Sequence, residues 1–139
     1  MTGRDFLSFA KTLPNSPDEA ARRSSVSRAY YAIFHQVKDI FISANIRLNN
    51  DAQDHGKLMH YLGVCKAPDA KYIGEKLKDL RTERNDADYD LGKNKFEKSH
   101  CEFQCRLAEI LCNKLDSIDR AVLNRELVDY ARIKGDLKT

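Results

Sequence analysis

Apolar residues recur every three or four positions along two long stretches of this chain, and that spacing limits what it can fold into. The stretches cover residues 16–45 and 70–91. Their apolar positions are Val26, Tyr30, Ile33, Val37, Ile40 and Ala44 in the first, and Ala70, Ile73, Leu77, Leu80, Ala87 and Leu91 in the second. This spacing forms one face of an α-helix, and no alternating pattern typical of a β-strand reaches a useful length. The sequence therefore predicts an all-α protein.

Three further segments complete the predicted set of helices. They cover residues 4–13, residues 52–64, where the pattern is weaker and includes a glycine, and residues 95–134. The last segment is predicted to form one helix, or two helices with a break around Ser117. A chain of 139 residues with 42% hydrophobic residues has material for one ordinary core. Residues 1–139 are therefore expected to form one domain, an antiparallel bundle of four or five helices with short loops. Residues 117–139 would be an extra C-terminal helix and a frayed, charged tail.

The ends of the two long helices carry residues with known end preferences. Ser16, Pro17 and Glu19 match a capping box with proline at the first helical position, so the first long helix is predicted to begin there. Gly92 follows the second apolar stripe, where a left-handed residue commonly ends a helix.

Charge and hydropathy exclude several classes of protein. The net charge of +3 is too small for a protein that coats nucleic acid, although it permits contact with an acidic partner. No apolar run is long enough to cross a membrane, and the N-terminus lacks the layout of a signal peptide. A cytoplasmic protein without membrane contact is expected.

The four cysteines are interpreted as packing residues. Cys101, Cys105 and Cys112 share one helix face, and Cys65 stands alone in a predicted loop. No CxxC pair begins a zinc site, and only His100 beside Cys101 hints at a metal. No metal and no cofactor are expected.

Arg84 stands in the apolar register of the second long helix, where a leucine would be usual. A guanidinium keeps its charge inside a protein and so requires acceptors. Arg81, Asn85 and Asp88 form a polar strip beside it. On the first long helix Arg28, Tyr31 and His35 share a face. If these helices pack side by side the strips meet, and Arg28 is expected to pair with Asp88.

Such a cluster has two interpretations. It is either a polar network that fixes the register of two helices or an anion site, in which arginines and an asparagine hold a phosphate and a histidine exchanges protons. The aromatic residues Tyr30, Tyr31 and Phe34 are expected in the core and at interfaces, although an exposed ring can stack on a base. The remaining basic groups, including Arg22, Arg23, Lys93, Lys95 and Lys98, are interpreted as solvated helix faces.

Three segments together resemble the HEPN family of small helical domains. They are "SRAYYAIFH" (27–35), "HGKL" (55–58) and "LRTERNDADYD" (80–90), in the family's order and with fitting gaps, so that the similarity extends over roughly residues 4–115. The resemblance implies a four- or five-helix bundle, commonly a homodimer, with a role in intracellular conflict systems. Many members are toxins that cut RNA without a metal and are encoded beside a minimal nucleotidyltransferase antitoxin that restrains them.

The catalytic motif of the family is only partly present. Active members carry an arginine, then a polar residue and, after four to six residues in all, a histidine; two copies meet at the dimer cleft. Arg84 and Asn85 match the beginning of this motif, but Tyr89, Asp90 and Leu91 stand where the histidine belongs. The departure favours a module that binds a nucleotide, RNA or a partner without turnover.

The binding residues of such a module would be Arg28, Tyr31, Arg81, Arg84, Asn85, Asp88 and Tyr89. The alternative is a metal-independent ribonuclease toxin in which Arg84 and Asn85 act with a non-standard histidine, His35, which follows Arg28 at the motif's spacing but lies on the earlier helix. A third possibility is a structural dimer whose polar strip only sets helix register.

Overall fold

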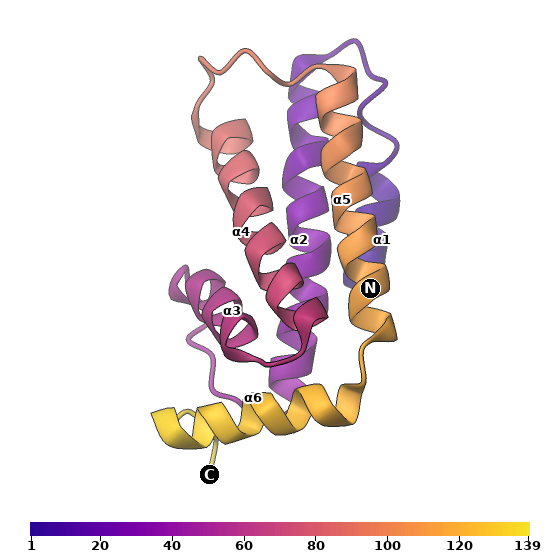
Figure 1. Ribbon diagram of the computed structural model, residues 1–139. Coiled ribbons are helices and arrows are strands. Elements are labelled where there is room, and N and C mark those ends of the chain that lie inside the picture. The colour runs from indigo at the N-terminus through magenta and orange to yellow at the C-terminus, as the bar shows by residue number, and fades with distance from the viewer.

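The computed structural model describes all 139 residues and consists of helices without a β-sheet. The helices are α1 (Gly3–Ala10), α2 (Glu19–Ser43), α3 (Gln53–Val64), α4 (Pro68–Tyr89), α5 (Lys98–Ser117) and α6 (Arg120–Lys134). In Figure 1, α2, α4 and α5 form the body of a bundle, α1 lies beside α2, α3 lies against α4, and α6 crosses one end. The predicted all-α bundle is confirmed. No helix is both long and apolar enough to span a bilayer.

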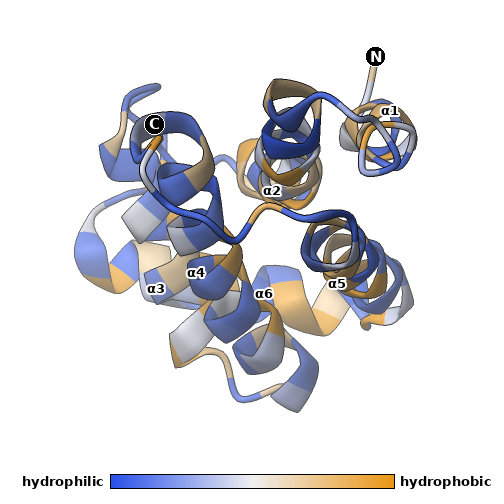
Figure 2. Ribbon diagram, turned by 90° about the horizontal axis from the view of Figure 1, so that it is seen from above, coloured by the Kyte–Doolittle hydropathy of each residue, from blue (hydrophilic) through white to orange (hydrophobic).

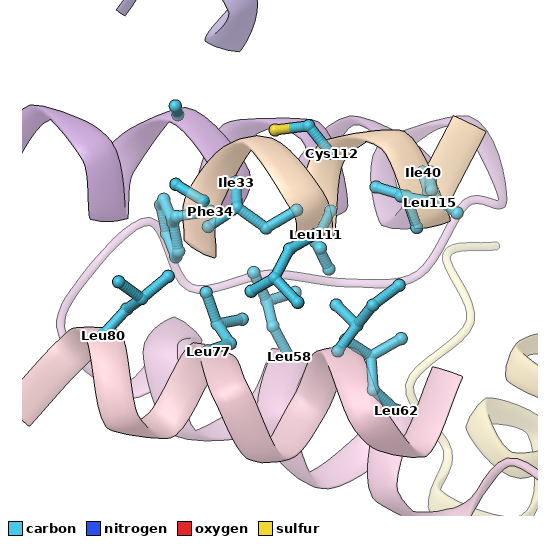
Figure 3. Close-up of a cluster of buried hydrophobic side chains, with 14 of the residues drawn as sticks. Ile33, Phe34, Ile40, Leu58, Leu62, Leu77, Leu80, Leu111, Cys112 and Leu115 are labelled. Atoms are coloured by element: carbon cyan, nitrogen blue, oxygen red, sulfur yellow. The ribbon is translucent and has the colours of Figure 1, made fainter. Parts of the chain in front are cut away.

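The core lies where the predicted apolar stripes face one another. Figure 2 shows that the helices carry both hydrophilic and hydrophobic residues, as amphipathic helices of a bundle do. The central side chains come from α2, α3, α4 and α5, as Figure 3 shows for Ile33, Leu58, Leu77 and Leu111. All four cysteines are buried and free, as expected for packing residues. Leu91, the last residue of the second stripe, is instead 77% exposed.

The first long helix begins later than its sequence signals predict. The chain is still turning at Ser16, whose amide donates to the carbonyl of Leu13. Asp18 is the cap of α2, and its carboxylate accepts from the amide of Ala20 at 3.1 Å. The predicted capping box at Ser16 is therefore wrong. The carboxylate of Asp18, which directly precedes the helix, accepts from the amide of its first turn instead. Similarly, α1 ends at Ala10, three residues before the predicted end.

The side chain of a buried arginine caps the C-terminal end of α4. Arg23 of α2 is only 6% exposed. Its NH1 group donates to the carbonyls of Asp86, Ala87 and Asp90, and its NH2 group donates to those of Leu91 and Lys93, all at 2.7–3.2 Å. A helix end leaves four carbonyls without helical partners, and this side chain reaches two of them, Asp86 and Ala87, and three more just beyond the helix.

The cap by Arg23 corrects two expectations from the sequence. Gly92 does not adopt the left-handed conformation, and α4 ends at Tyr89 without a glycine cap. The interpretation of Arg22 and Arg23 as solvated is also wrong. The Arg23 Nε pairs with Glu19 at 3.1 Å, its guanidinium carbon lies 4.5 Å from the centre of the Phe96 ring, and Arg22 donates to the Phe96 carbonyl. Lys95 is partly buried too, since it pairs with Glu83 and Asp86 of α4.

The C-terminal segment is two helices and a fixed tail. The break expected around Ser117 is present, and Asp119 caps α6 by accepting from the amide of Val122. The tail does not fray as predicted. The backbone amide of Lys138 donates to the carbonyl of Asn45 at 2.8 Å, and the Asp136 carboxylate accepts from the hydroxyl of Tyr61. The tail therefore ties α6 to the segment that follows α2.

Replacing Arg23 by alanine should destabilise the protein by about 3 kcal/mol, because several enclosed carbonyls at the end of α4 lose their donors. Urea unfolding followed by circular dichroism measures the change. Arg132→Ala is the matched control, since this arginine is exposed and its pairing with Asp129 is worth at most about 0.5 kcal/mol. An Arg23→Ala variant as stable as the parent would contradict the assigned role.

Candidate functional site

The packing of α2 on α4 brings one residue of the predicted α2 strip, Tyr31, against the polar strip of α4. The guanidinium carbon of Arg84 lies 5.1 Å from the centre of the Tyr31 ring. One turn earlier on α2 and one turn later on α4, the hydroxyl of Ser27 donates to the Asp88 carboxylate at 3.1 Å. Residues far apart in the sequence thus form one polar face on α2 and α4.

Arg84 is held mainly by groups of its own helix. Its side chain is only 15% exposed, and its Nε lies 3.1 Å from a carboxylate oxygen of Asp88. This contact is an ion pair rather than a directed hydrogen bond, because the N–H of Nε has no acceptor in line with it. The NH1 group donates to the amide oxygen of Asn85 at 2.8 Å, and Tyr89 contributes a second ring 5.3 Å from the guanidinium carbon. A charged group therefore fits into the apolar register because two rings and one carboxylate surround it.

The expected pair between Arg28 and Asp88 is not formed. Arg28 is exposed and its guanidinium lies over the ring of Phe6 on α1, 5.0 Å from the ring centre. The register of α2 turns Ser27 toward α4 and the next residue toward α1. Arg28 is therefore on the same side of the molecule but does not contact the Arg84 cluster.

His35 also faces α1 rather than α4. Its ring lies 5.5 Å from Phe6, 5.4 Å from Phe34 and 6.0 Å from Tyr31, measured between ring centres. Burial, then the charge of Lys38, lowers its pKa below the usual value for histidine. It lines a cavity of about 230 Å³ beside Asp39 and the N-terminal residues. Tyr31 contacts both His35 and Arg84, and no hydrogen bond joins His35 to the arginine.

A different histidine, His55 of α3, belongs to the cluster. Its ring stacks on Phe34 with centres 4.5 Å apart and meets the Tyr31 ring edge to face at 6.0 Å. Its Nδ1 lies 2.5 Å from the hydroxyl of Tyr30. Burial first, and then the charges of Arg81 and Arg84, lower its pKa.

Sequence reasoning did not identify His55 as a site residue. The only available signal was the "HGKL" segment of the family resemblance. Its position in a weak helical pattern gave no reason to place it beside residues some 25 positions away on either side.

Arg81 and Asn85 extend the cluster into a groove between α3 and α4. The groove has a volume of about 770 Å³, and its lining includes Lys71, Glu75, Lys78, Arg81 and Asn85. The Nε of Arg81 is enclosed and has no acceptor in the chain. Gly74 lets the helices approach, since a Cβ atom there would lie 3.1 Å from the Cβ of Leu62.

Positive charge exceeds negative charge in this cluster. Arg81 and Arg84 lie one turn apart, yet the single carboxylate within ion-pair distance of either is that of Asp88, paired with Arg84. The nearby Asp54 is buried, and its carboxylate accepts from the amides of Asn49 and Asn50. Guanidinium groups with free donors bind phosphate in a two-pronged geometry. The arrangement can therefore hold an anion.

Removing either arginine should raise the pKa of His55. Arg81→Ala and Arg84→Ala each delete a positive charge that disfavours the imidazolium form, so the histidine would titrate at higher pH. An NMR titration of the ring carbon protons measures the pKa. Arg28→Ala is the control, because this charge acts on His35 and should raise the pKa of that residue alone. An unchanged His55 pKa in both variants would mean that the three groups are not close.

Comparison with protein family models, with curated proteins and with solved structures finds no match. The resemblance to the HEPN family therefore remains an expectation that depends on the three quoted segments.

Proposed function

We propose that this protein is a HEPN-like module that binds phosphate groups of RNA or of a nucleotide on the face made by α2, α3 and α4, without turnover. The observation that carries the proposal is the charge excess of Arg81 and Arg84: Arg84 pairs with Asp88, and no carboxylate lies within ion-pair distance of Arg81, whose buried Nε has no acceptor. Both side chains are partly buried, so the unmatched charge costs free energy in the unliganded protein. A bound anion removes that cost.

The neighbouring groups suit a nucleotide better than a small inorganic anion. Tyr89 is 75% exposed and its ring lies against the Arg84 guanidinium, so a base can stack on its outer face. Tyr31 supplies a second, half-buried ring on the other helix. Lys71 and Lys78 continue the basic surface along the groove, where a phosphate backbone can follow.

The geometry favours binding over cleavage. Position 89 is tyrosine where the family motif requires histidine, and His35 packs against Phe6 of α1, with no hydrogen bond to Arg84. A ribonuclease built on this chain would therefore lack the histidine that the family motif places beside Arg84 and Asn85. Ribonuclease activity is the alternative that the RNA-binding experiment also tests.

The setting of the module follows from the resemblance. It would act in the cytoplasm of a prokaryote, in a conflict system of the toxin–antitoxin type, as a homodimer and with a minimal nucleotidyltransferase as possible partner. Tyr89 and Leu91 are both strongly exposed beside the site, which agrees with a surface that meets another molecule.

Arg84→Ala should weaken the binding of a fluorescein-labelled single-stranded RNA at least tenfold, since a charged contact to phosphate is worth about 1.5–3 kcal/mol. Fluorescence anisotropy in the presence of EDTA measures the affinity, and gel electrophoresis of the same samples detects cleavage. Arg84→Lys should also bind weakly, because an ammonium cannot form the two-pronged contact.

The control for this experiment is Arg132→Ala on α6, which should bind RNA like the parent. Circular dichroism shows whether each variant folds. Equal binding by Arg84→Ala and the parent would overturn the proposed site. Cleavage by the parent that disappears in Arg84→Ala or His35→Ala would establish the ribonuclease instead.

The protein should sediment as a dimer, because two copies of the site meet at a shared cleft in the HEPN arrangement. Sedimentation equilibrium should give twice the chain mass of 15.9 kDa at micromolar concentration. A measured mass of one chain at all concentrations would contradict a binding site formed at a dimer cleft.

A further inference from the structure

The contact between Tyr30 and His55 fixes which ring nitrogen carries the proton. Tyr30 is fully buried, and its hydroxyl has one partner in the chain, Nδ1 of His55 at 2.5 Å. Burial raises the pKa of this phenol, so the oxygen keeps its proton. An enclosed O–H with a single neighbouring acceptor must donate to it. Nδ1 is therefore the acceptor, and a neutral ring carries its proton on Nε2.

The ring is held in this orientation. Phe34 stacks on it with an angle of 18° between the planes, and Tyr30 stacks at 17°. The Nε2 atom has no partner in the chain and is not enclosed. The Nε2–H of His55 is thus free to donate, and Tyr31 contacts both the His55 ring and the Arg84 guanidinium.

Burial and most of the charged groups around His55 lower its pKa and so favour the neutral ring. Arg81 and Arg84 approach from α4 and Lys38 from α2, and all three disfavour a second proton. The phenols of Tyr30 and Tyr31 also face it from α2. Asp54 on α3 favours protonation, but its carboxylate is occupied by two backbone amides.

We propose that His55 is a fixed hydrogen-bond donor to the phosphate held by Arg81 and Arg84, and that Tyr30 sets this role by occupying Nδ1. The inference rests on the proposed function and adds to Arg81 and Arg84 of α4 a third phosphate-binding residue, which comes from α3. It also agrees with the proposed binding without turnover. The Nε2 atom already carries a proton, so it cannot accept one from a 2′-hydroxyl, as the base of a ribonuclease must.

Two substitutions test the roles of the two ring nitrogens of His55 separately. In His55→Asn the amide oxygen replaces Nδ1 as the acceptor for Tyr30, but no donor reaches outward. In His55→Gln the amide nitrogen replaces Nε2, while the acceptor near Tyr30 is lost. The asparagine variant should fold like the parent and bind the labelled RNA about tenfold more weakly. The glutamine variant should bind within about threefold of the parent and be less stable.

The tautomer itself is measured without any ligand. Long-range nitrogen–proton NMR spectra of the free protein at neutral pH should show His55 with a protonated Nε2 and an unprotonated Nδ1. Tyr30→Phe should yield a mixture of the two neutral tautomers. A proton on Nδ1 in the parent, or full RNA affinity in His55→Asn, would overturn the inference. If the parent itself binds no RNA, the proposed function fails, and the NMR result decides the state of His55 separately.

Discussion

Hydrogen bonds from one buried guanidinium attach the C-terminal end of α4 to α2. Arg23 of α2 donates to five carbonyls at and beyond the end of α4, and so fastens the last turns of α4 to α2. Arg84 and Asp88 lie in these turns, and their distances to Tyr31 and Ser27 follow from that attachment. The candidate site thus lies in the part of α4 that a side chain some sixty residues away holds against α2.

Arg23 and Arg84 show two outcomes of one physical rule. A guanidinium that leaves bulk water needs acceptors, and Arg23 finds them in backbone carbonyls and Glu19, so its role is structural. Arg84 finds one carboxylate and one amide oxygen, and its neighbour Arg81 has an enclosed Nε without an acceptor. The unmatched donors distinguish the second arginine from the first. They are the reason to expect a ligand here and not at the end of α4.

Local signals in the sequence predicted the helices, because apolar spacing of three and four residues directly reflects which helix faces are buried. Of the polar strip predicted on α2, only Tyr31 contacts Arg84 of α4. Contacts between distant segments were not predictable in this way. The cap by Arg23, the position of His55 and the attachment of the tail through Asp136 all depend on the packing of helices that are remote in sequence. The sequence predicted Arg28 as the partner of Asp88, but the preceding residue, Ser27, has that role. The spacing of residues along α2 does not show which helix packs against each of its sides. The functional assignment still depends on the family resemblance and the charge excess.

The central claim is that Arg81, Arg84 and His55 form one phosphate site. A crystal structure of the protein with a short single-stranded RNA tests this most directly. The account predicts a phosphate oxygen within hydrogen-bond distance of both guanidinium groups and of the His55 Nε2, with Nδ1 still bonded to Tyr30. RNA bound on another face, or a carboxylate of a second subunit that satisfies both arginines, would contradict it.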